Sequence, residues 1–212
     1  MKDETLIPLF QCLDVNLKDK NSVDVTALHE TGHLLVMYAL GMMDYFEYIT
    51  VNAGEHTNEV TGVTNSVKGL TQLTQEYRDL LQQFANELIQ AGIPKSGKAV
   101  TEVMRKVKVQ GAALYLPNIC RLFGGGAICR YYEVPDENMC KIDYDFIDTL
   151  LMGLGISGSR EAMRTLVDMY LNAVFTSFDL LTKAIYKNLK QKGTLTKPQV
   201  MQIIAEWEAF NM

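Results

Sequence analysis

The feature that most restricts the fold of this chain is the pentapeptide HETGH at residues 29–33, which places two of its three histidines four residues apart. The surrounding apolar residues recur at helical spacing from about residue 25 until Gly41 provides a stop. Either Asp24 or Thr26 can cap the start of such a helix. Four residues make slightly more than one helical turn, so both imidazoles project from one face, with their Cβ atoms roughly 6 Å apart.

Two imidazoles at this spacing suit a single metal ion. Neutral imidazole nitrogens bind zinc at about 2.0–2.1 Å, and a catalytic zinc site keeps one position open for water. Glu30 directly follows His29, so its carboxylate can reach that water as a general base instead of serving as a ligand. A glycine such as Gly32 inside a helix lowers helix stability by on the order of 1 kcal/mol relative to alanine. A glycine there needs a reason, and we predict a close approach of another backbone. We therefore predict His29 and His33 as metal ligands and Glu30 as a catalytic base.

A third protein ligand is needed to complete such a site, and residue spacing leaves its identity open. The extended metzincin pattern is excluded because the residue six positions after His33 is Ala39. His56 lies between two predicted strands, where we expect an exposed turn residue. Glutamates have suitable chemistry, but spacing selects none of Glu55, Glu59, Glu76 and Glu87.

The remaining pattern predicts a mainly α fold with a small β-sheet, of the α+β class. Two β-branched segments, 46–51 and 60–67, indicate a hairpin or two adjacent strands. Helical periodicity covers 71–91, 99–109, 112–132 with an interruption at Gly124-Gly125-Gly126, 142–153, 159–190 and 196–209. We expect a single domain over 1–212, in which a zincin-like active-site helix is followed by short strands and a C-terminal helical bundle with one long helix. Residues 71–109 are expected to form a helical insertion.

The clearest helical pattern is the apolar stripe between residues 159 and 190, which we expect to face the core. Its members are Met163, Leu166, Val167, Tyr170, Val174, Phe178, Leu181, Ile185 and Leu189. The last helix is expected to have Thr196 as its N-cap and Pro198 in its first turn.

Composition narrows the range of partners. The 212 residues carry a net charge of −5 and the pI is about 5.3, which argues against general attraction to nucleic acid or anionic lipid. The longest apolar run, Leu34–Met43, is about half of what a bilayer requires. The first residues carry acids where a secretory signal would carry bases, and the four cysteines form no C-x-x-C pair. We expect a cytoplasmic protein with reduced thiols.

One phosphate-binding motif is matched only in part. Residues 92–98, GIPKSGK, fit the G-x-x-x-x-G-K half of such a loop. The next residue, Ala99, offers no hydroxyl to magnesium, and the preceding segment is predicted to be helical where a strand is needed. We expect a turn between two helices.

Residues 27–33, ALHETGH, followed by YITV at 48–51, resemble the peptidase domain of FtsH-type zinc proteases. Members of that family carry a histidine-glutamate-x-glycine-histidine helix and then a short strand. LFGGGA at 122–127 is similar to the family's glycine pair at a helix start, and GTLT at 193–196 is similar to the segment before its last helix. The resemblance covers about residues 25–67 and 112–205, and only the metal-binding pentapeptide is specific.

The resemblance implies further site residues. The family takes its third zinc ligand from an aspartate on a helix after the glycine pair, which corresponds here to Asp143. Asp145 is the nearest alternative, and Asp148 would lie on a different helix face. An extended substrate is expected to pair with an edge strand near 46–51, at Ile49, Thr50 and Val51. The family's membrane anchor and ATPase module have no counterpart in this sequence.

Three functions are consistent with the sequence. The first is a zinc-dependent metalloendopeptidase that acts on unfolded or flexible polypeptides through a metal-activated water. The second is a non-catalytic regulatory or protein-binding module that retains the scaffold, although retention of Glu30 argues against it. The third is a helical protein whose histidines bind no metal. We expect the first, with Zn²⁺ as cofactor, a polypeptide substrate, no nucleic-acid or membrane partner, and either self-association or a separate partner protein.

Overall fold

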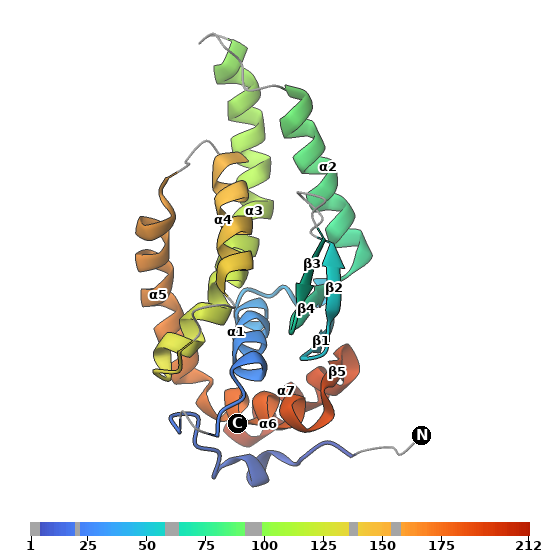
Figure 1. Ribbon diagram of the computed structural model, residues 1–212, viewed down its shortest axis with the longest axis vertical. Coiled ribbons are helices and arrows are strands. Elements are labelled where there is room, and N and C mark those ends of the chain that lie inside the picture. Colours follow the sequence, from blue (N-terminus) through green and yellow to red (C-terminus); the bar gives the residue numbers. More distant parts are fainter. Residues whose placement is uncertain (1–4, 20–21, 58–63, 92–98, 136–139, 154–157) are drawn as a thin grey trace.

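The computed structural model describes residues 5–19, 22–57, 64–91, 99–135, 140–153 and 158–212. The helices are η1 (Leu9–Cys12), α1 (Val25–Ala39), η2 (Met43–Tyr45), α2 (Gln75–Ala91), α3 (Ala99–Tyr131), α4 (Cys140–Gly153), α5 (Arg160–Ser177), α6 (Asp179–Lys192) and α7 (Lys197–Asn211). The strands are β1 (Phe46–Thr50), β2 (Gly54–Thr57), β3 (Thr64–Val67), β4 (Leu70–Leu73) and β5 (Thr194–Thr196). The fold is mainly helical with a small antiparallel sheet, as predicted (Figure 1).

Helix α1 lies in the centre of the molecule (Figure 1). The Asp24 side chain caps it by accepting a hydrogen bond from the Ala27 amide at 3.1 Å, which satisfies a donor that has no partner within the helix. Every residue from Ala27 to Met37 is buried, and α1 packs against α3. The predicted helix is confirmed, and its central position removes both histidines from solvent.

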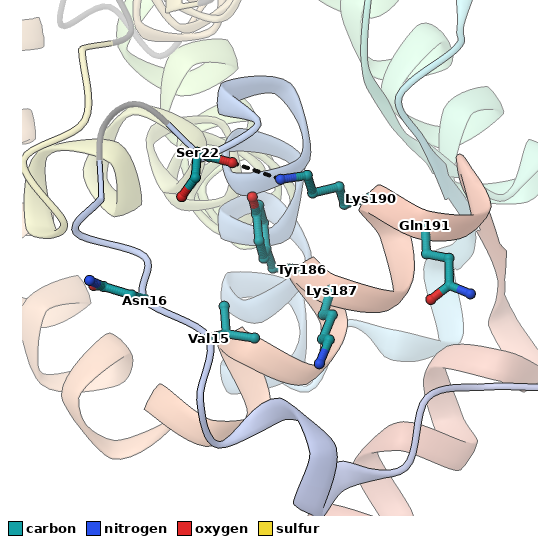
Figure 2. Close-up of a pocket in the computed structure, with 7 residues that line it drawn as sticks. All are labelled: Val15, Asn16, Ser22, Tyr186, Lys187, Lys190 and Gln191. Atoms are coloured by element: carbon teal, nitrogen blue, oxygen red, sulfur yellow. Dashed lines mark hydrogen bonds between the residues drawn. The ribbon is translucent and has the colours of Figure 1, made fainter.

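Helix α6 holds the segment that leads into α1. The Tyr186 hydroxyl accepts a hydrogen bond from the Asp24 amide at 2.9 Å, and Lys190 Nζ donates to the Ser22 carbonyl at 2.7 Å. The pocket between the two segments is lined by Val15, Asn16, Ser22, Tyr186, Lys187, Lys190 and Gln191 (Figure 2). The start of the histidine-bearing helix is therefore fixed by the C-terminal part of the chain.

Strand β1 is the central strand of a three-stranded sheet with the order β4-β1-β5. Ile49 lies opposite Thr71 of β4 on one side and opposite Leu195 of β5 on the other, and both pairings are antiparallel. Strands β2 and β3 pair with each other in a separate sheet. The expected pairing of 46–51 with 60–67 is therefore wrong. Strands β4 and β5 have only four and three residues, too short to show a period-2 pattern in the sequence.

The predicted insertion at 71–109 differs from the structure at both ends. Residues 71–73 belong to β4, and α2 begins only at Gln75. At the other end no helix boundary occurs near residue 109, because α3 is one helix of 33 residues that contains Pro117 and the glycine run 124–126. Helix α2 and the first part of α3 extend side by side beyond the sheet (Figure 1).

The predicted long helix over 159–190 is two helices. Helix α5 ends at Ser177 and α6 begins at Asp179, with Phe178 between them at φ −110° and ψ 22°. Leu166 and Tyr170 are 66% and 44% exposed, so these two members of the predicted core stripe face solvent. The longest described helix is α3, outside the C-terminal bundle.

Two other predicted helices are confirmed. Helix α4 covers the predicted 142–153, and α7 begins after Thr196, whose amide donates to the Gln199 side chain at 2.9 Å. Buried apolar side chains from all seven α-helices and the three-stranded sheet form one cluster. Among the helices of the described ranges, none has the length and apolar character needed to cross a bilayer.

Candidate metal centre

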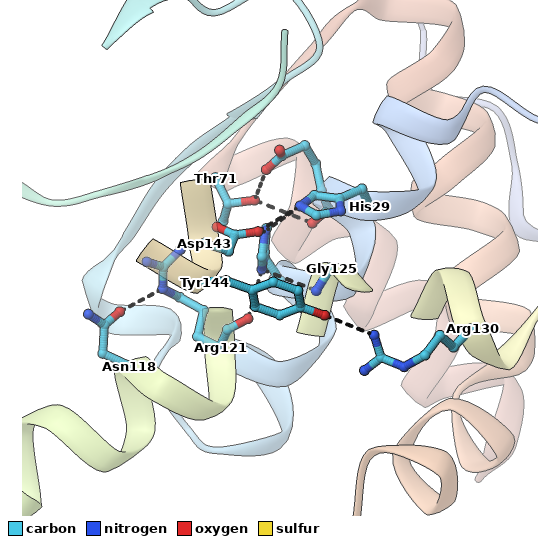
Figure 3. A network of polar contacts seen from close by, with 10 residues as sticks. His29, Thr71, Asn118, Arg121, Gly125, Arg130, Asp143 and Tyr144 are labelled. Carbon is cyan, nitrogen blue, oxygen red and sulfur yellow. Dashed lines mark hydrogen bonds and ion pairs between the residues drawn. The ribbon is translucent and has the colours of Figure 1, made fainter. Parts of the chain in front are cut away.

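Three side-chain donors from two helices converge at the centre of the fold. His29 Nε2 lies 2.9 Å from Asp143 Oδ2, and His33 Nε2 lies 3.3 Å from the same oxygen. The two imidazole nitrogens are 3.0 Å apart. Helix α1 supplies both histidines and α4 supplies the aspartate (Figure 3). Within the described residues, these three side chains form a group that can hold a metal ion.

The donor geometry fits a tetrahedral metal ion. Ligands bound at about 2.0–2.1 Å in that arrangement are separated by about 3.3 Å. The donor–donor distances of 2.9, 3.0 and 3.3 Å equal that separation or fall slightly below it. Two neutral imidazoles and one carboxylate are also the ligand types of many catalytic zinc sites. The residues therefore fit a divalent cation after shifts of a few tenths of an ångström.

A hydrogen bond fixes which nitrogen of His33 faces the site. Its Nδ1 lies 2.7 Å from the backbone carbonyl oxygen of Arg121, so the imidazole donates to that carbonyl. The Gly125 amide is 3.3 Å from the same nitrogen, a longer contact that a protonated Nδ1 cannot accept. With Nδ1 protonated, Nε2 keeps its lone pair for a metal ion. Helix α3 thus orients a ligand that α1 carries.

The glycines of α1 and α3 allow the two helices to touch backbone to backbone. A Cβ on Gly32 would lie 2.4 Å from the Gly124 carbonyl oxygen, and a Cβ on Gly124 would lie 2.7 Å from the Gly32 carbonyl oxygen. A Cβ on Gly125 would lie 2.4 Å from His29 Nε2. Helix α3 continues through the glycine run. Gly124 lies where the two helices cross, and Gly125 lies against the His29 imidazole. The close approach predicted at Gly32 is confirmed.

Glu30 is buried beside the two histidines, and residues around β4 hold its carboxylate. Its side chain is 4% exposed. The Thr71 hydroxyl donates to Glu30 Oε2 at 2.8 Å (Figure 3). A Cβ on Gly69 would lie 2.6 Å from Glu30 Oε1, so a larger residue here would displace the carboxylate from its position. One oxygen of Glu30 is therefore fixed by a neutral donor.

Asp143 is held as a carboxylate. Burial raises the pKa of this group, but the adjacent imidazoles of His33 and His29 outweigh burial and hold the pKa well below its ordinary value. An ionised carboxylate is the form that binds a metal ion. Asp145 is exposed, and Asp148 pairs with Arg160 at 2.5 Å. Of the three aspartates considered from the sequence, the structure brings Asp143 to the histidines.

Two arginines attach α4 to its neighbours next to Asp143. Arg130 Nη1 donates to the Tyr144 hydroxyl at 3.3 Å (Figure 3), and Arg130 Nη2 pairs with Asp168 at 2.7 Å. The Arg160 guanidinium lies over the Tyr144 ring, 5.2 Å from its centroid. These contacts join α3 and α5 to the turn of α4 that carries the candidate ligand.

Two of the predicted substrate residues, Ile49 and Thr50, lie in β1, whose two edges are already paired, and the third, Val51, directly follows it. Ile49 is fully buried, and the Thr50 hydroxyl donates to the Gly193 carbonyl at 3.0 Å. The Val51 amide donates to the same carbonyl at 2.9 Å. The prediction of an edge strand at 46–51 is therefore wrong, because β4 and β5 occupy both sides of it.

The other candidate ligands are not part of the group. His56 lies in β2 opposite Asn65, so its prediction as a turn residue is wrong. Glu55 is also in β2, and Glu76 and Glu87 lie on α2. Glu59 and the partial phosphate-loop motif at 92–98 lie outside the described residues.

Sequence reasoning missed three contributors to this centre: Gly69, Thr71 and the Arg121 carbonyl. A glycine that directly precedes a strand is a signal for close backbone approach, so Gly69 was detectable in principle. A backbone carbonyl has no sequence signal.

Comparison with protein-family models gives no match for this chain, and comparison with curated protein sequences gives no significant relative.

Proposed function

We propose that this chain is a zinc-dependent metalloendopeptidase, similar to the FtsH-type peptidases, that cleaves unfolded or flexible polypeptides. The observation that supports it best is the convergence of His29, His33 and Asp143 next to the buried carboxylate of Glu30. Glu30 lies beside the group but bonds to Thr71, as expected for a base and not for a ligand. A purely structural metal site needs no such carboxylate.

The residues divide the chemistry between them. His29, His33 and Asp143 would hold Zn²⁺, which when bound lowers the pKa of a water molecule and polarises the scissile carbonyl. Glu30 accepts the proton of the attacking water and then donates it to the leaving amine. Thr71 holds Glu30 Oε2, which restricts rotation of the carboxylate and favours one position for this transfer.

We place the substrate along β4 instead of β1. Strand β4 is an outer strand of the sheet, and within the described residues no strand pairs with its other edge. An extended peptide can add to such an edge through backbone hydrogen bonds. Gly69, directly before β4, passes close to Glu30, and Thr71 in β4 bonds to it, so a peptide bound along this strand would pass the proposed catalytic base.

The proposal is tested by metal analysis and proteolysis with the untagged protein. We expect about one zinc per chain and cleavage of a labelled unfolded protein. Glu30→Gln should retain zinc and lose about 10²- to 10⁴-fold in kcat, because only the proton transfer is removed. His33→Ala should lose both zinc and activity. Asp143→Asn should weaken zinc binding, whereas Asp145→Asn, at an exposed position, is the matched control.

Each alternative gives a different result. Stoichiometric zinc with no cleavage by the wild type would favour the non-catalytic module. Absence of bound zinc after incubation with excess Zn²⁺ would favour the helical protein with unmetallated histidines. Loss of zinc from Asp145→Asn but not from Asp143→Asn would contradict the assignment of the third ligand.

A further inference from the structure

Helix α5 exposes large apolar side chains on its outer face. Leu166 is 66% exposed, Met169 is 71% exposed and Tyr170 is 44% exposed. The three residues are adjacent on the helix surface, since positions three and four apart share a face. A contiguous exposed apolar patch on a protein surface commonly marks an interaction site.

The exposed residues follow the spacing of a helix-pairing seam. Successive intervals of four, three, four and three residues connect Ala162, Leu166, Met169, Ala173 and Thr176, all of which are exposed. This 4-3 alternation is the seam of two helices that pack along each other. The opposite face of α5 already packs in the core through Val167, Leu171 and Val174. Helix α5 therefore has one apolar face for its own fold and a second that faces outward.

The charges around this seam are compatible with a second copy of the same helix. Those on and beside α5 are paired within the chain: Arg164 with Glu161 at 2.6 Å, Arg130 with Asp168 at 2.7 Å, and Arg160 with Asp148 at 2.5 Å. The residues that flank the centre of the seam, Thr165 and Asn172, are uncharged. Two copies can approach along the seam without bringing unpaired like charges together.

We propose that α5 pairs with α5 of a second copy of this chain in an antiparallel, two-fold symmetric dimer centred between Met169 and Ala173. A two-fold axis at this point places Met169 opposite Ala173 of the second copy, and Leu166 opposite its Thr176. Large side chains thus meet small ones on both halves of the seam, which lets two helices approach closely. A second copy of α5 provides this pairing of large with small side chains twice, once on each side of the two-fold axis.

The proposed seam uses none of the residues of the candidate metal centre. Helix α5 contacts α1, α3, α4 and α6, and it lies at the outer edge of the molecule with α3 and α4 on its inner side (Figure 1). The seam is made by the side chains that these contacts leave exposed. The inference is independent of the proposed peptidase activity, and its test uses no activity measurement.

Sedimentation velocity of the full chain over a range of concentrations tests the dimer. One helix pair gives a small interface, so we expect a dissociation constant on the order of 1–100 μM. Met169→Lys places an unpaired charge in the seam on each side of the axis and should raise this constant at least about tenfold. Met201→Lys on α7, at a methionine that is 40% exposed, is the matched control and should leave it unchanged. Circular dichroism should show that both variants remain folded.

Two complementary variants test the antiparallel register. Met169→Lys and Ala173→Glu should each be monomeric alone, because each introduces two unpaired charges into the seam. Mixed in equal amounts they should dimerise, since the introduced ammonium group of one chain then meets the introduced carboxylate of the other while the second contact stays Met–Ala. A wild type that is monomeric up to about 1 mM, an assembly that Met169→Lys does not weaken, or a mixture that stays monomeric would overturn the proposal.

Discussion

Glu30 is positioned by the hydroxyl group of Thr71, and a substitution to valine replaces that hydroxyl with a methyl group. The Thr71 hydroxyl donates to Glu30 Oε2 at 2.8 Å in a buried environment. Valine has the same shape as threonine without the donor. Of the described contacts of Glu30, this one is the most directly open to mutation, because Thr71 belongs to the sheet and not to the metal group.

Thr71→Val should therefore retain the metal and lose about 10- to 100-fold in kcat, the cost of removing a buried hydrogen bond to a charged group. Thr71→Ser keeps the hydroxyl and should stay within about threefold of the wild type. Steady-state kinetics with metal analysis of the same samples measures both effects. Equal activity of the valine and serine variants would contradict a role for this hydrogen bond.

Gly125 provides the space in which the His29 imidazole lies. Gly125→Ala would place a methyl group 2.4 Å from His29 Nε2, so we expect zinc affinity to fall about 10- to 100-fold. Alanine is the better helix former by about 1 kcal/mol, so the helix itself should not be weakened. Gly124→Ala is a different case: it clashes with a backbone carbonyl and should lower the melting temperature as well. Titration with zinc and thermal unfolding distinguish the two; wild-type affinity in Gly125→Ala would contradict the inferred clash.

How well a site residue could be predicted depended on how far along the sequence it lies from the residues that it contacts. His29 and His33 were predictable because residues four apart share one face of a helix, and Glu30 was predictable because it directly follows the first histidine of the motif. Asp143 required a resemblance to a known family, since 114 residues separate it from His29 and no local pattern connects them. The contacts that hold the ligands and Glu30 in place depend on tertiary packing. The bond from His33 to the Arg121 carbonyl cannot be read from the sequence, because every residue has a backbone carbonyl.

Among the elements, those with local start and stop signals were predicted best. Asp24 and Gly41 mark the ends of α1, and Thr196 marks the start of α7. Strands β4 and β5 could not be predicted, because pairing with β1 and not their own sequence makes them strands. The apolar stripe of 159–190 concealed the boundary at Phe178, since α5 carries apolar residues on two faces.

The N-cap of α1 offers a test at the level of an element. Asp24→Ala removes the acceptor of the Ala27 amide hydrogen bond and should lower the free energy of unfolding by about 1 kcal/mol. For a chain of this size that corresponds to about 2–4 °C in melting temperature. Asp24→Asn keeps the capping oxygen and should lose much less. Scanning calorimetry of the three proteins checks this, and indistinguishable melting temperatures would show that the cap contributes nothing.

For the whole molecule, a bound metal ion would join α1 to α4. An ion that binds only the folded chain stabilises it by about 4 kcal/mol when present at about a thousand times its dissociation constant. Removal of zinc with a chelator should then lower the melting temperature by about 8 °C or more. His33→Ala should melt at the same temperature with and without chelator. An unchanged melting temperature for the wild type would mean that no ion connects the two helices.

The separation of the two ligand-bearing helices along the chain also has a consequence during synthesis. Both histidines leave the ribosome 110 to 114 residues before Asp143 (143 minus 33 and 143 minus 29), which at cellular rates is a delay on the order of ten seconds. Under the proposed function, a growing chain that has not yet folded belongs to the same class of substrate as the polypeptides to be cleaved. Because the third ligand arrives last, the proposed site is incomplete until α4 has been synthesised and has docked, so the proposed cleavage cannot begin before then.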